Sequence, residues 1–198
     1  MARDRSSRPE AKPLRLFVAV DIPEDVKSRL GASLQPFRER VPGARWTSTE
    51  GWHVTLKFLG STWPRLVESV RNAVRSAAAG QSSFESALSE IGAFPSAKRA
   101  RVLWAGLANP QGRFGTLVAT LDDLLREHFV PEKRVFTPHL TVARLNPMAN
   151  LLDAAPDLFE TSVASRPFAV DCLVLYRSHL SPRGARYEAV DRFPLRSS

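Results

Sequence analysis

Two short segments of the chain each contain a histidine and a threonine two positions apart. The first is HVTLKFL, residues 53–59, and the second is HLTVARL, residues 139–145. Side chains on a strand alternate between its faces, so each histidine shares a face with its threonine and the residues between them point to the other face. The chain has four histidines, and two of them occupy this frame. The repetition indicates a polar strand face that is used twice.

The residues of this face suit chemistry at phosphorus. His53 and His139 can supply a general acid and a general base, because imidazole titrates near neutral pH. Thr55 and Thr141 can each donate a hydroxyl hydrogen bond to an oxygen beside the neighbouring histidine. If the strands lie side by side, the four groups form a nearly symmetric site for in-line displacement. Two core histidines are the alternative, but two matched frames favour catalysis.

The remaining pattern indicates how the motif strands are held. A length of 198 residues suits one domain or two small lobes that share a core. We expect a flexible basic tail over residues 1–13 and a single bilobal domain over residues 14–198. Besides the motifs, periodicity predicts strands at 14–20, 84–94, 101–107, 168–176 and 186–193. It predicts helices at 23–40 and 64–80, and a short helix beginning at 146–147. A further helix is expected to be capped at Asn109, with an apolar face that spans 114–125.

Charge and composition narrow the partner and the location. The chain carries 28 Lys and Arg against 20 Asp and Glu, a formal charge of +8, which favours polyanionic partners such as nucleic acid. The lone cysteine, Cys172, excludes an internal disulfide. No apolar run reaches the roughly 18 residues that span a membrane, and the polar start lacks the apolar segment of a secretory signal. We predict a cytoplasmic protein without membrane contact.

No cofactor is expected from the sequence. A histidine followed two positions later by threonine offers no second strong metal ligand, and the single cysteine cannot complete a metal site. The chain also lacks the G-x-x-x-x-G-K-[ST] loop that cradles nucleoside triphosphates.

The doubled frame, with Phe17-Val18-Ala19-Val20 upstream and Pro138 before the second histidine, resembles the two-histidine phosphoesterase superfamily. Within it, the chain is most similar to the RNA 2′,3′-cyclic phosphodiesterases of the 2′-5′ RNA ligase family, from about residue 14 to 193. The resemblance implies a bilobal α+β fold with two antiparallel sheets, flanking helices and a central cleft. It also implies hydrolysis of an RNA terminal 2′,3′-cyclic phosphate to a 2′-phosphate without metal or ATP. The expected partner is RNA with such an end, for example a tRNA fragment, and the expected state is a monomer.

The resemblance also assigns roles to the four motif residues. His53 matches the proton donor of the family and His139 the proton acceptor. Thr55 and Thr141 match the threonines that bind phosphate.

Two basic residues of the motifs are further candidates for substrate binding. Lys57 has the strand parity of His53 and could meet phosphate, although an exposed solubilising lysine fits equally. Arg144 has the wrong parity for a regular strand, so it reaches the site only if the strand bends or bulges. An arginine at this place in the family favours a binding role.

Other polar and aromatic residues are less informative. His128 is expected to be an ordinary histidine at a helix C-terminus, and His179 a solvated residue of a basic loop. Trp46 and Trp52 flank the first motif and are the better candidates for stacking on a nucleobase.

Three alternative functions stay open. The same site with a 5′-hydroxyl in place of water would be an ATP-independent 2′-5′ RNA ligase. A non-catalytic RNA- or nucleotide-binding module is disfavoured by the intact histidines and threonines. An enzyme for a small cyclic phosphate is disfavoured by the charge of +8.

Overall fold

The computed structural model of the chain describes residues 12–41, 43–181 and 184–197. Its main element is an eight-stranded sheet with strand order β10-β9-β1-β3-β7-β6-β5, in which β2 pairs with β7 outside this path, and a smaller sheet joins β4 to β8. The strands pair antiparallel. Their bounds are β1 Leu14–Asp21, β2 Ala44–Trp46, β3 His53–Thr62, β4 Phe84–Ser86, β5 Leu88–Phe94, β6 Ala100–Leu107, β7 His139–Ala149, β8 Phe168–Val170, β9 Cys172–Ser181 and β10 Gly184–Pro194.

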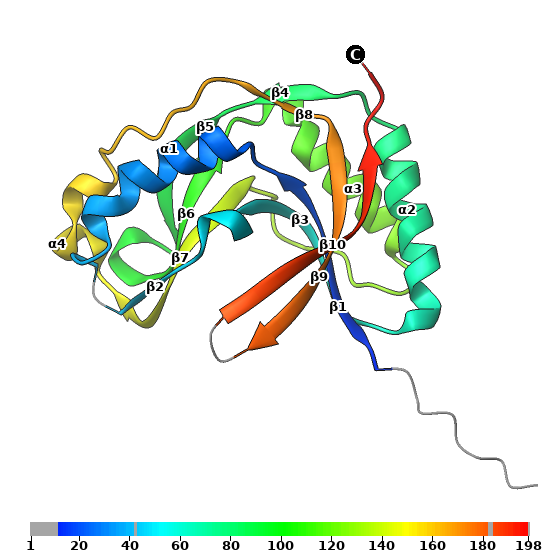
Figure 1. Cartoon of the computed structure of the whole chain (residues 1–198), viewed down its shortest axis with the longest axis horizontal. Coiled ribbons are helices and arrows are strands. Elements are labelled where there is room, and N and C mark those ends of the chain that lie inside the picture. Colours follow the sequence, from blue (N-terminus) through cyan, green and yellow to red (C-terminus); the bar gives the residue numbers. More distant parts are fainter. Residues whose placement is uncertain (1–11, 42, 182–183, 198) are drawn as a thin grey trace, which may run out of the picture.

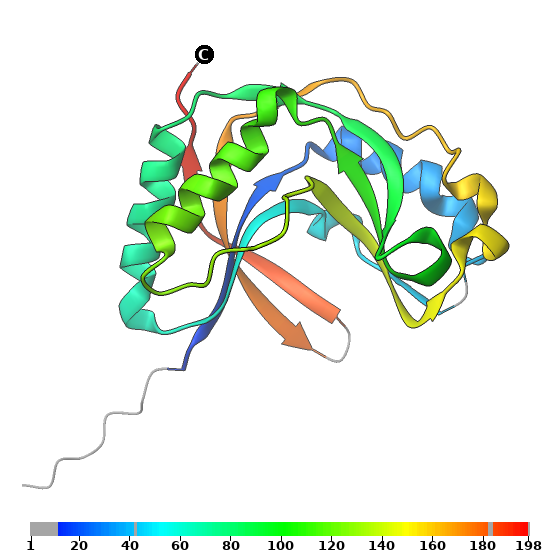
Figure 2. The same cartoon turned by 180° about the vertical axis from the view of Figure 1, so that it is seen from behind.

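Helices flank the sheet at both ends of the molecule. Figure 1 and Figure 2 show α2 and α3 side by side at one end, and α1 with α4 at the other. The α-helices are α1 Glu24–Leu34, α2 Val67–Ala79, α3 Arg113–Leu125 and α4 Leu151–Ala154, and the 3-10 turns are η1 Gln35–Phe37, η2 Thr49–Gly51, η3 Pro64–Leu66, η4 Ala97–Arg99, η5 Pro110–Gly112 and η6 Pro156–Leu158. Within the described ranges, no helix has both the length and the apolar character needed to cross a membrane.

The two motif strands join the halves of the large sheet. One half contains β10, β9, β1 and β3, and the other contains β7, β6, β5 and β2. β3 and β7 pair through Val54 and Leu140, and both side chains are fully buried. The predicted α+β class with antiparallel strands and flanking helices is confirmed, and the strands of the two halves share one sheet.

The amphipathic helices form as their spacing predicts. Apolar residues three and four positions apart face the core. The predicted cap is confirmed in part: Gly112 is the N-cap of α3, while Asn109 precedes the turn η5 and its side chain accepts a hydrogen bond of 3.0 Å from the backbone of Phe114 in the first turn of α3. The buried residues are Val70, Ala73, Val74, Ala77 and Ala78 in α2, and Phe114, Leu117, Val118, Leu121 and Leu125 in α3. They belong to the same hydrophobic core as Val54 and Leu140.

Two predicted strands are each divided in the structure. Residues 84–94 form β4 and β5, and residues 168–176 fall in β8 and the first half of β9. The divisions arise because β4 pairs with β8, from Phe84 opposite Val170, while β5 and β9 stay in the large sheet. This pairing is long-range, so local alternation does not predict it.

Two predicted helices differ from expectation. The α-helix predicted over 23–40 ends at Leu34 and continues as the 3-10 turn η1, since Pro36 has no N–H to continue the α-helical hydrogen bonds. The helix predicted at 146–147 is wrong: β7 continues to Ala149, which pairs with Ala100 of β6. The helix starts instead at α4, capped by Asn150. Of the predicted basic tail, residues 1–11 lie outside the described residues.

Candidate active site

Both motif histidines are oriented by the same backbone contact. Nδ1 of His53 lies 2.7 Å from the carbonyl oxygen of Gly51, and Nδ1 of His139 lies 2.7 Å from the carbonyl oxygen of Thr137. A carbonyl oxygen only accepts hydrogen bonds, so each Nδ1 carries a proton. The neutral form of each ring therefore has its lone pair at Nε2, the atom left to accept or deliver a proton.

Aromatic rings from neighbouring strands surround His53. Phe17 stacks on the imidazole with ring centroids 4.8 Å apart, Tyr187 meets it edge-on at 4.9 Å, and Tyr176 lies at 5.8 Å. This burial lowers the pKa of His53 to about 4, outweighing the opposite effect of the negative charge of Asp21. His53 is consequently neutral at pH 7 in the free protein.

His139 has a similar but more open environment. Phe94 meets its ring edge-on at 5.1 Å, and Trp104 lies at 6.0 Å. Burial lowers the pKa of His139, and the positive charge of Arg144 lowers it further. The neutral imidazole that a general base requires is therefore favoured.

The register between the motif strands brings the two motifs together. β3 and β7 meet at the antiparallel pair of Val54 and Leu140, whose side chains are buried on the core face. The residues on either side of this pair turn to the other face, where each histidine lies opposite the threonine of the other strand. Four side chains share this face and all are partly exposed: His53, Thr55, His139 and Thr141.

A bulge in β7 places Arg144 on the same face. β6 pairs Trp104 with Thr141 and Val102 with Arg144. The two partners on β6 are two positions apart, whereas Thr141 and Arg144 are three apart, so β7 contains one extra residue. The bulge turns the exposed Arg144 side chain to the face of Thr141. Arg144 was expected to reach the site only if the strand bends or bulges, and the bulge in β7 meets this condition.

A matching bulge in β3 carries Lys57 away from the histidines. Neighbouring residues of β1 lie opposite Thr55 and Lys57, so β3 has one extra residue between these two. The Lys57 side chain therefore lies on the face of β3 that packs against the core, opposite the histidines, and is only 6% exposed. Its Nζ forms an ion pair with Asp122 of α3 and donates to the carbonyl oxygen of Val130 at 3.2 Å. The prediction that strand parity brings Lys57 to the phosphate is wrong.

Phe58 takes the place in β3 that Arg144 takes in β7. Each follows its histidine by five positions, and the β3 bulge turns Phe58 to the face of its cross-strand partner Phe17, which stacks on His53. The Phe58 ring is 52% exposed, with the guanidinium of Arg15 4.5 Å above it. Sequence reasoning missed this residue, although aligning the two seven-residue frames sets it over Arg144.

The remaining candidates have other environments. Trp52 is only 2% exposed, which removes it as a candidate for stacking on a nucleobase, whereas Trp46 is partly exposed. The prediction that His179 lies in a basic loop is wrong, because it belongs to β9, and its Nε2 lies 2.6 Å from a carboxylate oxygen of Glu188. His128 is exposed after α3.

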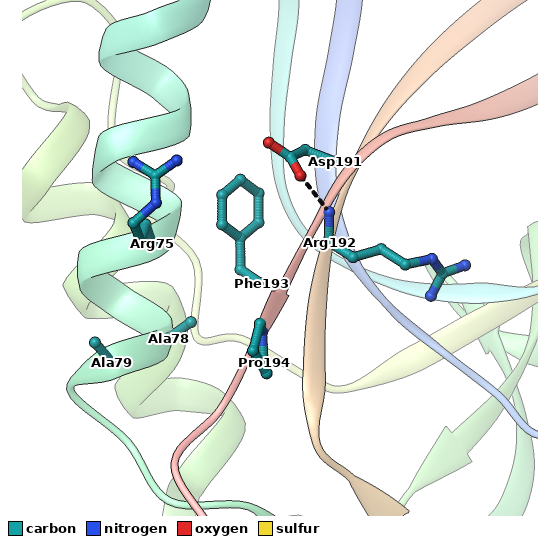
Figure 3. A pocket seen from close by; sticks show the side chains of 7 residues that line it. All are labelled: Arg75, Ala78, Ala79, Asp191, Arg192, Phe193 and Pro194. Carbon is teal, nitrogen blue, oxygen red and sulfur yellow. Dashed lines mark hydrogen bonds between the residues drawn. The ribbon is translucent and has the colours of Figure 1, made fainter.

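A pocket between α2 and β10 contains no predicted site residue. Figure 3 shows Arg75 on one side of it and the Arg192 side chain directed away. Its lining consists of Arg75, Ala78, Ala79, Asp191, Arg192, Phe193 and Pro194. In the part of the chain that the structure describes, no three His, Cys, Asp or Glu side chains lie close enough together to hold a metal ion.

Comparison with known proteins finds one family. The sequence profile described as LigT like Phosphoesterase matches residues 20–104 and 107–187. An RNA 2′,3′-cyclic phosphodiesterase of Methanothermobacter thermautotrophicus is 31% identical, with 92% of this chain and 99% of that protein covered. One of the same name from Thermotoga maritima is 29% identical, with 89% and 93% covered.

Solved structures share the fold. A Thermus thermophilus protein superposes with a TM-score of 0.75 at 26% identity, covering 93% of this chain and 99% of that one. Escherichia coli LigT, crystallised with 3′-AMP, gives a TM-score of 0.72 at 23% identity, with 92% and 98% covered. The second likeness bears on the fold alone.

Proposed function

The chain belongs to the LigT-like phosphoesterase family, and from this premise we propose that it hydrolyses the terminal 2′,3′-cyclic phosphate of RNA to a 2′-phosphate, without metal or ATP. The observation that carries the proposal is the register of β3 and β7, which sets each histidine opposite the threonine of the other strand. The names of the relatives from Methanothermobacter and Thermotoga support RNA 2′,3′-cyclic phosphate as the substrate.

The two imidazoles divide the proton transfers. Nε2 of His139 removes a proton from water, and the water oxygen forms a bond to phosphorus. The bond from phosphorus to the 3′ oxygen breaks, and protonated Nε2 of His53 gives that oxygen its proton. The phosphate stays on the 2′ oxygen. Thr55 and Thr141 donate hydrogen bonds to the phosphate oxygens that gain charge in the transition state.

The low pKa of His53 makes its acid role depend on the substrate. The free imidazole is neutral because its surroundings exclude water. A phosphate anion beside Nε2 favours the imidazolium and raises the pKa again. We infer that His53 takes up its proton when the anionic substrate binds, and that Asp21, its cross-strand partner, adds to this stabilisation.

Two further side chains of the same face contribute to binding. The exposed guanidinium of Arg144 can pair with phosphate oxygens through two parallel N–H bonds. The exposed ring of Phe58 offers a surface on which a base can stack. This assignment replaces Trp52 with Phe58 and removes Lys57 from the substrate-binding set.

We also propose that residues 14–198 form one domain. The support is the large sheet, which contains strands from both halves of the chain, from β1 to β10.

The experiment that tests the function uses an RNA oligonucleotide ending in a 2′,3′-cyclic phosphate, incubated with the protein and a chelator. We expect a product heavier by one water, whose phosphate resists an enzyme specific for 3′-phosphates. An unchanged cyclic end, or activity abolished by the chelator, contradicts the proposal, and a 3′-phosphate product reverses the acid and base assignments. A second RNA with a 5′-hydroxyl in the same mixture reports any joining.

A further inference from the structure

The ion pair of Lys57 with Asp122 is buried and takes no part in the proposed proton transfers. The β3 bulge turns Lys57 to the core face, where its Nζ meets the carboxylate of Asp122 in α3. The Lys57 side chain is 5% exposed and that of Asp122 15%. Burying two charges is costly even when they pair with each other. An apolar side chain at position 57 would avoid this cost but could form no hydrogen bond.

The hydrogen bonds of the pair hold the segment that leads into the second motif. Residues 126–138 connect α3 to β7 without helix or strand (Figure 2). Lys57 donates to the carbonyl oxygen of Val130 at 3.2 Å, and the second carboxylate oxygen of Asp122 accepts from the backbone nitrogen of Glu132 at 3.2 Å. In the part of the chain that the structure describes, these two hydrogen bonds are the ones that join residues 130–136 to the rest of the molecule.

The pair therefore connects the two motif strands on the core side of the sheet. Lys57 belongs to β3, and the segment held by Asp122 continues into β7. Among the described residues, the direct pairing of β3 with β7 consists of Val54 and Leu140. Because this pairing is so short, the position of one motif relative to the other depends on contacts outside it. The ion pair supplies such a contact through α3.

The same segment orients His139. The carbonyl oxygen of Thr137 lies 2.7 Å from Nδ1 of His139. Thr137 lies between two anchored points, Glu132 upstream and Pro138 downstream, whose carbonyl oxygen accepts a hydrogen bond of 3.0 Å from Leu107. The direction of a carbonyl group depends on the backbone dihedrals on either side of it. Release of the upstream anchor would therefore free the peptide group that keeps the proton on Nδ1.

We propose that Lys57 and Asp122 are positioning residues of the active site: their ion pair holds residues 130–137 so that Nδ1 of His139 keeps its proton and Nε2 stays free to act as the base. The kinetic consequence rests on the proposed function, whereas the consequence for the His139 ring can be measured without a substrate.

Three variants and a control separate positioning from stabilisation. Lys57→Met and Asp122→Asn each break the ion pair. The double variant, Lys57→Met with Asp122→Leu, replaces both charges with apolar side chains and leaves Val130 and Glu132, which are exposed, to water. The control Val74→Ala shortens a fully buried side chain of another helix, α2.

Stability should recover in the double variant. Removing one partner leaves the other charge buried and unpaired, whereas replacing both partners by apolar side chains is often neutral. Lys57→Met and Asp122→Asn should therefore lower the melting temperature, and the double variant should regain most of the loss. Val74→Ala should also lower the melting temperature, because it leaves a cavity in the core.

Activity should not recover with stability. At a temperature at which every variant is folded, kcat and kcat/KM for the cyclic-phosphate oligonucleotide should fall together by about 10–100-fold in all three pair variants, because a displaced base weakens the transition state. Val74→Ala should keep the kcat of the unmodified protein. A double variant that regains both its melting temperature and its kcat would overturn the inference, since the pair would then contribute stability alone.

The ring ¹⁵N chemical shifts of His139 give the second readout. They distinguish a proton on Nδ1 from a proton on Nε2 in the neutral ring. At neutral pH the shifts of His139 should move toward a mixture of the two tautomers in the double variant. Those of His53 should stay unchanged, because its acceptor Gly51 lies outside the segment.

The two readouts fail separately. If the unmodified protein leaves the cyclic phosphate intact, the proposed function fails, and the ¹⁵N shifts alone decide whether the ion pair positions His139. Shifts of His139 that are identical in the unmodified protein and the double variant would overturn the inference, whatever the activity.

Discussion

The indole nitrogen Nε1 of Trp52 donates a hydrogen bond of 2.7 Å to the hydroxyl oxygen of Thr47. That hydroxyl lies 3.0 Å from the carbonyl oxygen of Thr141 and 2.9 Å from that of Val142. Trp52 directly precedes His53, so the contact links the start of the first motif strand to the bulge of the second. The side chains of Trp52 and Thr47 thereby connect the residue before His53 to the backbone of β7 at Thr141 and Val142.

Removing the Thr47 hydroxyl should loosen this link. In Thr47→Val, Nε1 of the buried Trp52 loses its acceptor, and an unsatisfied buried polar group costs about 1–3 kcal/mol. Urea unfolding should show this loss in the free energy of unfolding. Thr116→Val, at an exposed position of α3, is the control and should be close to neutral. Equal unfolding midpoints for the two variants would mean that the link contributes no stability.

The motif threonines should matter through their hydroxyl groups. Thr55→Val and Thr141→Val each remove one hydrogen bond to a charged phosphate, which is worth about 1.5–3 kcal/mol. We expect kcat/KM for the cyclic-phosphate oligonucleotide to fall by about 10–100-fold in each variant. Thr55→Ser and Thr141→Ser should recover most of that loss. Serine variants as poor as the valine variants would argue against a hydroxyl role.

The pH dependence of activity should reflect two histidines with lowered pKa values. The mechanism needs one neutral and one protonated imidazole, and the pKa of His53 is about 4 while that of His139 is below its ordinary value. In the free protein both imidazoles have lost their protons by the time the pH exceeds 6.5. The protonated acid then becomes scarcer as the pH rises, so kcat/KM should decline above pH 6.5. A bound phosphate anion raises both pKa values, so the alkaline limb of kcat should lie at higher pH. A kcat/KM that rises steadily from pH 5 to 8 would contradict this.

The stability of the fold should fall in acid because His53 resists protonation. Above pH 6.5 the ring is neutral in the folded and the unfolded chain, so it has no effect. Between pH 6.5 and about 4 the unfolded chain binds a proton that the folded chain does not, which destabilises the fold by up to about 3 kcal/mol. Between pH 7 and 4.5, the free energy of unfolding measured with urea should therefore fall less for His53→Gln than for the unmodified protein. Equal losses would mean that His53 does not titrate in this way.

Sequence reasoning located the polar face of each motif because strict alternation holds from His53 to Thr55 and from His139 to Thr141. It failed one residue later, where each strand has a bulge. A regular strand places Lys57 beside the histidines and Arg144 away from them, and the two bulges reverse both positions. Aligning the frames offered a signal, since Lys57 corresponds to Ala143, a residue suited to burial.

Other features depend on contacts that local sequence does not encode. Trp52 was placed among the nucleobase-stacking candidates because it adjoins the motif, yet its nitrogen is satisfied by Thr47 inside the protein. The pairing of Arg45 with Arg144 joins two distant segments of the chain, so the local sequence does not predict it. Helices such as α2 were predicted well because their apolar spacing is local.

The central claim is that His53 and His139 perform the proton transfers, and single-turnover cleavage of the cyclic-phosphate oligonucleotide tests it most directly. His53→Ala and His139→Ala should each lower the rate by about 10²–10⁴-fold, the usual contribution of a positioned acid or base. His128→Ala and His179→Ala remove the other two histidines and should cleave at the rate of the unmodified protein. A folded His53→Ala or His139→Ala protein that retains the full rate would contradict the account.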